Sequence, residues 1–472
     1  MSDRPHIVIL MPDQHRGDCL SCAGHPVVRT PNLDRIAAEG IRFTNAYTTS
    51  PLCMPARNSF LAGLFCHNHG QWDNVGHLPP DADTYLRHVK ARGYRTCQVG
   101  KSHLYEHVRG EHLNRYRPFM HALGWDDVLE TTGPHATRWT DSIVTDHWQS
   151  LGCLKTFRDD YTRRVQAGSL AATWPSPMPD GQTLDDFVGR TAVEYVRGYH
   201  RDEPLLLFVG FPGPHEPWDP PADWAARYDP TAMDPVQPVP EPPSWLPLTA
   251  AEYHRRTLNR SLAITPEISG RIRALYYAKI SHIDAWVGRI LDALAERGML
   301  DDTAVMVWSD HGEMLCDKGR LHKQVCFESS ARVPFLLRPP RCANPGAVSD
   351  RLISLVDGFP TILELAGCEP PAECFGRSLL PLIGRPDAQH HDAVFSEVGD
   401  RTMIRDERHK MVVNAAGDVL SLYDMIDDPA ERLNLVGRDD MAETVARLRD
   451  RLLDWLLSTQ QRQVKHPPAV AT

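Results

Sequence analysis

The sequence has no run of 18 apolar residues, so it contains no candidate transmembrane helix. Its first apolar run, residues 7–11, has the length of a strand and is too short for the hydrophobic region of a signal peptide. Long runs of lysine and arginine are also missing, and the net charge of −10 argues against general binding to nucleic acids or anionic membranes. These absences predict a cytoplasmic protein with no membrane or nucleic-acid partner.

Cysteine is present, but it lacks the spacing of a disulfide or metal framework. The 11 cysteines are scattered, and Cys19 and Cys22 form a C-x-x-C pair without a second such pair. We therefore expect reduced thiols, as in a cytosolic protein. Internal repeats are absent as well, and 472 residues of ordinary composition suffice for two or three domains with a large core.

Helical and apolar extended segments alternate along most of the chain. This alternation predicts an α/β domain over residues 1–384, with a large, mostly parallel sheet flanked by helices. The strands are expected at residues 6–10, 41–47, 94–99, 204–211, 303–308 and 332–337. The helices are expected at residues 32–39, 58–64, 83–92, 182–200, 268–297 and 357–366.

Two regions depart from this alternation. Proline is dense from Pro217 to Pro247, which predicts an irregular excursion over about residues 217–265, at the rim of a site. From residue 385 to 472 the pattern predicts a smaller α+β domain with an antiparallel sheet and a terminal helix. Its strands are expected at residues 394–398, 401–405, 409–414 and 419–424, and its helix at 441–457.

Polar side chains follow four of the predicted strands. They are Asp13 with Gln14, Lys101 with His103, His215, and Asp310 with His311. In open α/β sheets, ligands bind outside the carboxyl ends of the strands. A single aspartate there is more often a helix cap, and a single histidine is more often a satisfied core residue. Their occurrence at four strand ends nevertheless favours one shared site.

Cys53 lies in the segment Ser50-Pro51-Leu52-Cys53-Met54-Pro55-Ala56-Arg57, directly before a predicted helix. Proline is favoured in the first turn of a helix, and the free N–H groups there favour negative charge. The position therefore suits a thiolate or a group that binds an anion. The alternative is a small buried residue at a helix start.

Asp13, Gln14, Asp310 and His311 together supply oxygen ligands and one imidazole. Ligand sets that consist mostly of oxygen suit Ca²⁺, Mg²⁺ or Mn²⁺ better than Zn²⁺, which favours nitrogen and sulfur. The sequence therefore predicts a site for one divalent cation.

The segment Cys53-Met54-Pro55-Ala56-Arg57, with Leu61-Ala62-Gly63 behind it, resembles the signature of the type I sulfatases, which belong to the alkaline phosphatase superfamily. In that family a formylglycine-generating enzyme oxidises the cysteine to formylglycine. The resemblance implies an alkaline-phosphatase-like fold and the hydrolysis of a small-molecule sulfate ester. It extends over nearly the whole chain, through residues 30–34, 40–47, 100–104, 214–218, 310–314, 323, 332–334, 422–424 and 427–431.

The resemblance also implies a role for each site residue. The cation, with Ca²⁺ expected first and Mn²⁺ or Mg²⁺ as alternatives, would be held by Asp13, Gln14, Asp310, His311 and the modified Cys53. A hydroxyl of the hydrated aldehyde would attack sulfur, and the sulfated enzyme would break down by hemiacetal collapse, which a thiol cannot perform. The remaining roles are to steady the diol (Arg57, Lys101), to act as base (His103) and acid (His215), and to contact the substrate (Lys323, Asn74).

Two departures from the family pattern leave alternatives open. Gln14 and His311 replace the Asp and Asn of many lysosomal sulfatases and resemble bacterial choline sulfatases and phosphonate monoester hydrolases. Lys101 and His103, in contrast, form the pair typical of sulfatases. Sulfate esters are therefore expected first, and a phosphonate monoester or phosphodiester hydrolase is the alternative. A metal-dependent phosphatase with unmodified Cys53 and an inactive binding protein are further alternatives, and we expect a homo-oligomer.

Overall fold

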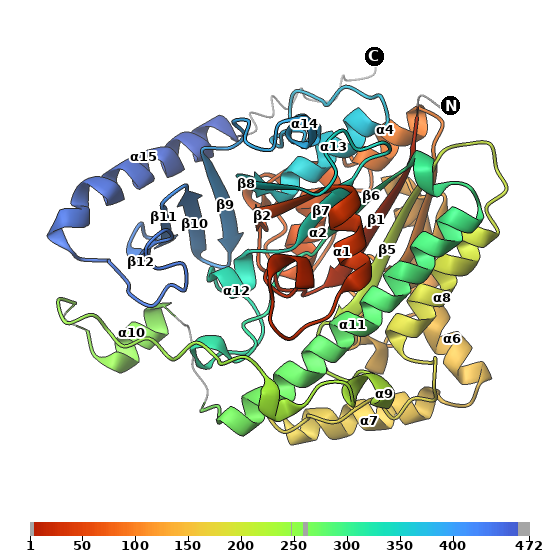
Figure 1. Cartoon of the computed structure of the whole chain (residues 1–472), viewed down its shortest axis with the longest axis horizontal. Coiled ribbons are helices and arrows are strands. Elements are labelled where there is room, and N and C mark those ends of the chain that lie inside the picture. Colours follow the sequence, from red (N-terminus) through yellow and green to blue (C-terminus); the bar gives the residue numbers. More distant parts are fainter. Residues whose placement is uncertain (1–3, 247, 258–262, 461–472) are drawn as a thin grey trace, which may run out of the picture.

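The computed structural model describes residues 4–246, 248–257 and 263–460 (Figure 1). Its main sheet has eight strands in the order β4-β3-β5-β1-β6-β7-β2-β8. These strands are β1 (His6–Asp13), β2 (Ile41–Tyr47), β3 (Arg95–Lys101), β4 (Asp127–Thr131), β5 (Leu205–Pro214), β6 (Thr303–Trp308), β7 (Phe335–Arg338) and β8 (Ala347–Ser354).

The prediction of a mostly parallel sheet is confirmed. β7 alone among these eight strands runs antiparallel to its neighbours, β6 and β2. The other pairs are parallel, and β1 is central, with Ile7 beside Leu206 of β5 and beside Ala304 of β6. Every residue of β5 and of β6 is buried, as expected for parallel strands that are covered on both faces.

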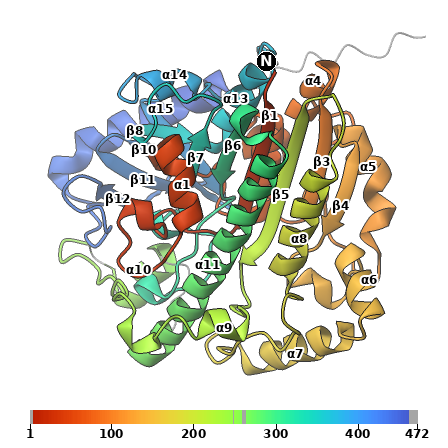
Figure 2. The same cartoon turned by 45° about the vertical axis from the view of Figure 1, so that its right-hand side comes forward.

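Helices cover both faces of this sheet. Successive side chains of a strand point to opposite faces, so each strand contributes to a core on either side. Ile7 and Ile9 of β1 contribute to a core with α2 (Cys53–Ala62), α4 (Tyr85–Ala91), α5 (Arg117–Leu123) and α13 (Gly358–Leu365). Val8 and Leu10 contribute to the core on the other side, with α1 (Pro31–Glu39), α8 (Leu184–Arg197) and α11 (Pro266–Glu296). Figure 2 shows α11 and α8 side by side over that face.

The predicted helices are present with shifts of a few residues, and the shift at Cys53 concerns the site. The helix was expected at residues 58–64, but α2 begins at Cys53 itself and ends before Gly63, which has a φ of 69°. Pro55 is its third residue, where no intrahelical N–H bond is required. Cys53 is therefore part of the first helical turn. The other helices of this region are α3 (Cys66–His69), α6 (Ile143–Ser150), α7 (Leu154–Ala167), α12 (Glu328–Ala331) and α14 (Leu380–Gly384).

The proline-rich excursion contains little regular structure among its described residues. Within residues 217–246 it forms two short helical turns, α9 (Ala222–Ala225) and a 3₁₀ turn (Pro230–Ala232), and α10 (Ala250–Thr257) follows. Residues 247 and 258–262 of the predicted excursion lie outside the described residues. In the described part of the chain, every helix is too short or too polar to cross a bilayer.

The C-terminal region forms a separate four-stranded antiparallel sheet, as expected. Its order is β12-β11-β10-β9, from β9 (Ala393–Val398), β10 (Arg401–Asp406), β11 (His409–Asn414) and β12 (Val419–Asp424). The last helix, α15 (Ala442–Ser458), packs on it through Leu448, Leu452 and Trp455, which lie on one helix face. The domain boundary at residue 384 stays a prediction.

Candidate active site

The four strand ends that the sequence singled out lie next to one another. β3, β5, β1 and β6 are consecutive in the sheet and parallel, so their carboxyl ends share one edge. Asp13 ends β1, Lys101 ends β3, His215 directly follows β5, and Asp310 follows β6 by two residues. The topology thus gathers side chains that are up to about 300 positions apart in the sequence.

Cys53 faces this edge from the start of α2. The residue is 2% exposed, and its Sγ lies 3.1 Å from Nε2 of His311. Leu52, before the helix, is extended with a φ of −151°, as is usual for the residue that precedes a helix. The next backbone N–H, of Met54, donates to Oδ1 of Asn74 at 2.9 Å. Asn74 therefore lies beside the start of α2 and satisfies one of its free N–H groups.

Arg57, one turn further along α2, joins three of the strand ends. Its Nε donates to Oδ2 of Asp310 and its Nη2 to Oδ2 of Asp13, each at 2.8 Å. Its Nη1 donates to the carbonyl oxygens of Lys101 and Ser102 at 3.0 Å. The guanidinium is almost completely buried, so these contacts take up its planar set of donors. Arg57 organises the site and has little capacity left for a substrate.

Asp13, Cys53, Asp310 and His311 form a cluster of potential cation ligands. One donor atom from each lies within 4.8 Å of the others, and all four residues are buried. Oδ1 of Asp13 is buried and has no hydrogen-bond partner in the described part of the chain. A buried carboxylate oxygen without a partner is costly, and a bound cation would satisfy it. The cluster therefore fits a divalent cation.

The charges around this cluster favour the ligand forms of its members. Burial alone would raise the pKa of Asp13, but the charges of Lys101 and Arg57 hold it well below its usual range. Burial would raise the pKa of Asp310 as well, but the charges of Arg57, His311 and Lys101 together lower it. Burial lowers the pKa of His311, so its imidazole is neutral and can donate a lone pair.

Gln14, the fifth predicted ligand, lies next to the cluster. Its backbone N–H donates to Oδ1 of Asp310 at 3.0 Å. Its side-chain Nε2 donates to Oε2 of Glu216 at 2.8 Å and to Glu313, and its Oε1 accepts from Lys323. The side-chain oxygen thus faces a cation already, namely the ammonium group of Lys323.

The predicted acid and base lie on neighbouring strand ends. Nε2 of His215 is 2.7 Å from Nζ of Lys323. His103 is half-buried and has a φ of 52°, and its Nδ1 is buried without a hydrogen-bond partner among the described residues. Burial, reinforced by the charge of Lys101, holds the pKa of His103 well below its usual range. A neutral imidazole with a free nitrogen can accept a proton.

Three further residues belong to this region and were not predicted as site residues. Glu216, Glu313 and His322 bring potential ligand atoms within 4.8 Å of one another, beside Gln14. Glu216 and Glu313 stand one and two residues after the predicted His215 and His311. Their proximity to these strand ends was the signal that could have identified them. His322 lies directly before Lys323 and carried no separate signal.

Comparison with known proteins identifies the family. A sequence model of the Sulfatase family matches residues 5–368, which is most of the chain. The chain belongs to the sulfatase family. A second model, described as the C-terminal region of N-sulphoglucosamine sulphohydrolase, matches residues 316–457. That match starts before β7 and so includes the last strands of the main sheet as well as the small sheet.

Individual relatives of this sulfatase-family enzyme cover nearly its full length. An arylsulfatase from Clostridium perfringens is 30% identical over 95% of this chain and 94% of its own. A choline-sulfatase from Rhizobium meliloti is 28% identical over 92% of this chain and 82% of its own. The crystal structure of a phosphonate monoester hydrolase from Agrobacterium radiobacter superposes with a TM-score of 0.79 at 25% identity, covering 97% and 96% of the two chains.

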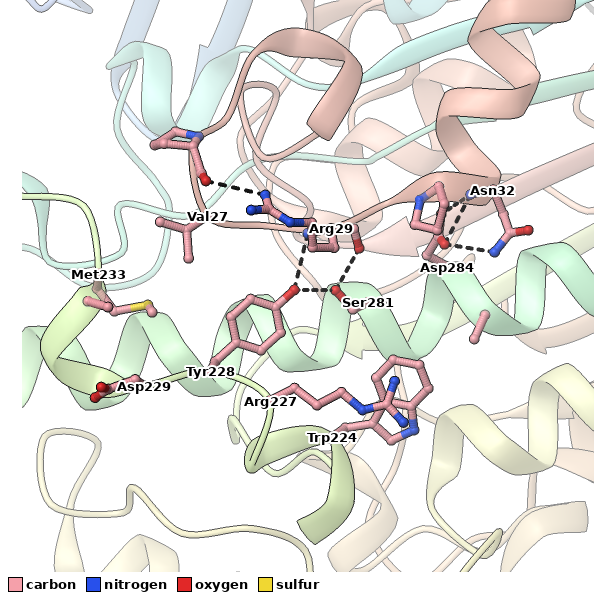
Figure 3. Close-up of a pocket in the computed structure, with 14 residues that line it drawn as sticks. Val27, Arg29, Asn32, Trp224, Arg227, Tyr228, Asp229, Met233, Ser281 and Asp284 are labelled. Atoms are coloured by element: carbon pink, nitrogen blue, oxygen red, sulfur yellow. Dashed lines mark hydrogen bonds between the residues drawn. The ribbon is translucent and has the colours of Figure 1, made fainter.

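Two cavities of this sulfatase-family enzyme differ in their relation to the strand ends. A cavity of about 630 Å³ lies against α11 (Figure 3), and its polar groups bond to one another. In it, Tyr228 lies 2.5 Å from Oγ of Ser281, which donates to the carbonyl of Arg29. A cavity of about 260 Å³ is instead lined by Glu216 and His322 and by the aromatic Tyr161 and Trp218. Neither cavity is lined by a predicted site residue, but the smaller one is lined by Glu216 and His322, the sequence neighbours of His215 and Lys323.

Proposed function

We propose that this sulfatase-family enzyme hydrolyses sulfate monoesters with Cys53, converted to formylglycine, as its nucleophile. The observation that carries this proposal is the position of Cys53, buried at the start of α2 with its Sγ 3.1 Å from His311 in the cation-binding cluster. The sulfur marks where the oxygens of a hydrated aldehyde would lie. Membership of the sulfatase family supports the same chemistry.

One divalent cation is proposed to be held by Asp13, Gln14, Asp310, His311 and the modified residue 53. The unpartnered Oδ1 of Asp13 and the mostly oxygen donor set support this proposal. Such a set favours Ca²⁺, with Mn²⁺ or Mg²⁺ as alternatives. When bound, the cation would neutralise charge on the sulfate and favour the deprotonated form of a hydroxyl group.

The chain's own residues would carry the proton transfers. One hydroxyl of the hydrated aldehyde gives its proton to Asp310 and attacks sulfur, and the bond from sulfur to the alcohol oxygen breaks as His215 gives that oxygen a proton. A covalent sulfated intermediate results. His103 then takes the proton of the second hydroxyl, the C–O bond to sulfate breaks, and the aldehyde is regenerated. Lys323, whose ammonium group is 2.7 Å from His215, would bind sulfate oxygens in the same place.

The proposal also covers the cellular compartment, the maturation partner and the oligomeric state of the enzyme. All 11 cysteines are free thiols, which is consistent with a cytoplasmic protein kept in a reducing environment. Conversion of Cys53 would require a formylglycine-generating enzyme as a transient partner. We further propose that the enzyme forms a homo-oligomer and acts on small molecules.

A phosphonate monoester hydrolase is the second candidate function. It is favoured by the similarity of the whole chain to the hydrolase from Agrobacterium radiobacter, at a TM-score of 0.79. Gln14 and His311 also fit this candidate. Lys101 and His103 favour the sulfatase reaction, because they form the pair that is typical of sulfatases.

The two candidates are separated by turnover measurements on converted enzyme. The chain is produced together with a formylglycine-generating enzyme, and the peptide around Cys53 is examined by mass spectrometry. We expect conversion and a higher kcat/KM for an aryl sulfate than for the matching aryl phosphonate. The variant Cys53→Ala should lose both activities. A higher kcat/KM for the phosphonate would favour the second candidate, and equal activity of Cys53→Ala would contradict the nucleophile.

A further inference from the structure

The side-chain amide of Gln14 is surrounded by three charged groups. Both of its N–H donors point at carboxylates, those of Glu216 and Glu313, and its carbonyl oxygen accepts from the Lys323 ammonium. Turned over, the amide would direct its oxygen at two carboxylates and its N–H groups at an ammonium. All three contacts would then be repulsive. The surroundings therefore permit one orientation of this amide.

The backbone of Gln14 leaves no other freedom. Its N–H donates to Oδ1 of Asp310 at 3.0 Å, and its carbonyl oxygen accepts from Oη of Tyr276 at 2.7 Å. The residue is completely buried and has a left-handed φ of 67°. Rotation of the terminal amide is the remaining way to exchange its oxygen and nitrogen.

Glu313 is the fixed part of this arrangement. One carboxylate oxygen, Oε1, accepts from the backbone N–H groups of Leu315 at 2.9 Å and His322 at 2.5 Å. The other oxygen, Oε2, accepts from Gln14. Glu313 is completely buried, so it cannot turn toward solvent. Two loops of the main chain thus determine where its second oxygen points.

Glu216 connects the same amide to the predicted acid. Its Oε2 accepts from Gln14 and lies 3.3 Å from Nδ1 of His215, and its Oε1 lies 3.1 Å from Nδ1 of His322. The carbonyl oxygen of Gln14 lies on the opposite side of the amide, where Lys323 contacts His215. Burial alone would lower the pKa of Lys323, but the nearby charges of Cys53, Glu216, Asp13 and Asp310 raise it. The carbonyl oxygen of Gln14 therefore lies on the side of the amide that is nearer to the cluster of potential cation ligands.

We propose that Glu313 and Glu216 are positioning residues that keep Oε1 of Gln14 turned toward the catalytic cation. The inference rests on the cation proposed above. A carboxylate ligand offers an oxygen in either orientation, whereas an amide ligand offers an oxygen in only one. Groups outside the coordination sphere that orient a ligand commonly change metal affinity 10- to 100-fold. In this protein, cation affinity would depend on two carboxylates that do not themselves bind the cation.

The variant Glu313→Gln tests this proposal at nearly constant side-chain volume. The two backbone N–H groups require an oxygen acceptor, so the new amide at position 313 must direct its NH₂ group at Gln14. The new amide would oppose an N–H group of Gln14, so only Glu216 and Lys323 would still favour the native orientation. The turned-over form, which presents N–H donors to the cation, would then become populated. We expect the Kd for Mn²⁺, measured by titration calorimetry on the purified full chain, to rise about 10- to 100-fold.

The change Gln14→Glu should reverse this effect, because a carboxylate has no amide orientation to lose. In the Glu313→Gln background, we expect it to tighten Mn²⁺ binding at least tenfold. In the native background it should bring no such gain, because the new carboxylate would face Glu216 and Glu313. A simple charge effect would instead tighten binding equally in both backgrounds.

A matched control removes a different buried carboxylate. Asp284 of α11 accepts from the backbone N–H groups of Asn32 and Leu33, away from Gln14 and the strand ends, so Asp284→Asn should bind Mn²⁺ with the native Kd. Circular dichroism and gel filtration verify that each variant is folded. A native Kd in Glu313→Gln, or an equal effect of Gln14→Glu in both backgrounds, would overturn the proposal.

Failure of the positioning role can be told apart from failure of the proposed function. If the native enzyme binds Mn²⁺ and hydrolyses an aryl sulfate while Glu313→Gln binds Mn²⁺ equally well, only the positioning role is wrong. If the native chain binds none of Ca²⁺, Mn²⁺ and Mg²⁺, the proposed cation and this inference fall together.

Discussion

Single residues at the strand ends have interaction patterns that their types do not reveal. Arg57 donates to two carboxylates and two carbonyl groups, so its guanidinium connects the ends of three strands. Glu130, at the end of β4, is buried and accepts from Ser102 and Tyr105. Because Ser102 lies between Lys101 and His103, Glu130 anchors the loop that carries the predicted base. At this scale, buried polar groups hold the site in place.

The pKa of Glu130 leads to a prediction on stability. Burial, opposed by hydrogen bonds from Ser102 and Tyr105, raises it to about 7 from an ordinary value of 4.5. The folded state therefore binds a proton more tightly than the unfolded state, and stability is lost as the pH rises from about 4.5 to about 7. The pKa difference corresponds to a loss of about 3 kcal/mol in the free energy of unfolding.

Glu130→Gln should remove this dependence. Urea unfolding of both proteins at pH 5 and pH 8 is the measurement, and the contributions of other groups cancel in the difference between them. We expect the variant to gain about 2–3 kcal/mol relative to the native protein between the two pH values. A difference that is independent of pH would contradict a raised pKa at Glu130.

Among the elements, α2 determines where Cys53 lies, and its two ends are specified differently. Its start combines the extended Leu52 with Pro55 in the first turn. Its end requires Gly63, which adopts a φ of 69° and packs against Phe359 of α13. A Cβ atom at position 63 would lie 2.9 Å from the Phe359 ring. The helix that carries Cys53 is thus held at its far end by close packing.

Gly63→Ala and Gly24→Ala form a matched pair for this element. Gly24 has a similar φ of 86°, but an added Cβ would have no neighbour within 4 Å. We expect Gly24→Ala to cost about 1–2 kcal/mol from backbone strain alone, and Gly63→Ala to cost more because the Phe359 ring must move. Chemical denaturation measures both. Equal losses in the two variants would show that the contact with Phe359 does not matter.

At the scale of the whole molecule, buried charges connect the main region with the C-terminal sheet. Lys410 of β11 is completely buried, and its Nζ lies 2.8 Å from Glu328 of α12 and 2.5 Å from Glu431. Removal of one partner from a buried ion pair leaves an uncompensated charge, which typically costs 3–5 kcal/mol. This cluster therefore makes the stability of one sheet depend on the other.

Lys410→Met should accordingly lower the free energy of unfolding by about 3–5 kcal/mol. The control is Arg432→Met, which breaks a surface pair with Asp428 at 3.3 Å in which the arginine is 68% exposed. That pair should contribute less than about 1 kcal/mol. Thermal and urea unfolding measure both variants. Similar losses for the two would mean that the buried cluster does not link the sheets.

The sequence by itself determined the α/β class, the small antiparallel sheet and the strand ends that carry the site. These features are local, because strands buried on both faces and long amphipathic helices have strong hydrophobic patterns. The strands missing from the prediction, β4 and β8, are the two edges of the main sheet. β8 has exposed residues within it, and edge strands of this kind carry a weaker pattern.

Only the tertiary structure showed which contacts each site residue makes. The residue types showed that Asp13, Gln14 and Arg57 could act together, but not that Arg57 is fully engaged or that Gln14 lies between Glu216 and Glu313. These contacts join positions 44 to 299 residues apart, and no local pattern encodes them. The order of strands in the sheet brings these residues together, and burial then requires each polar group to find a partner.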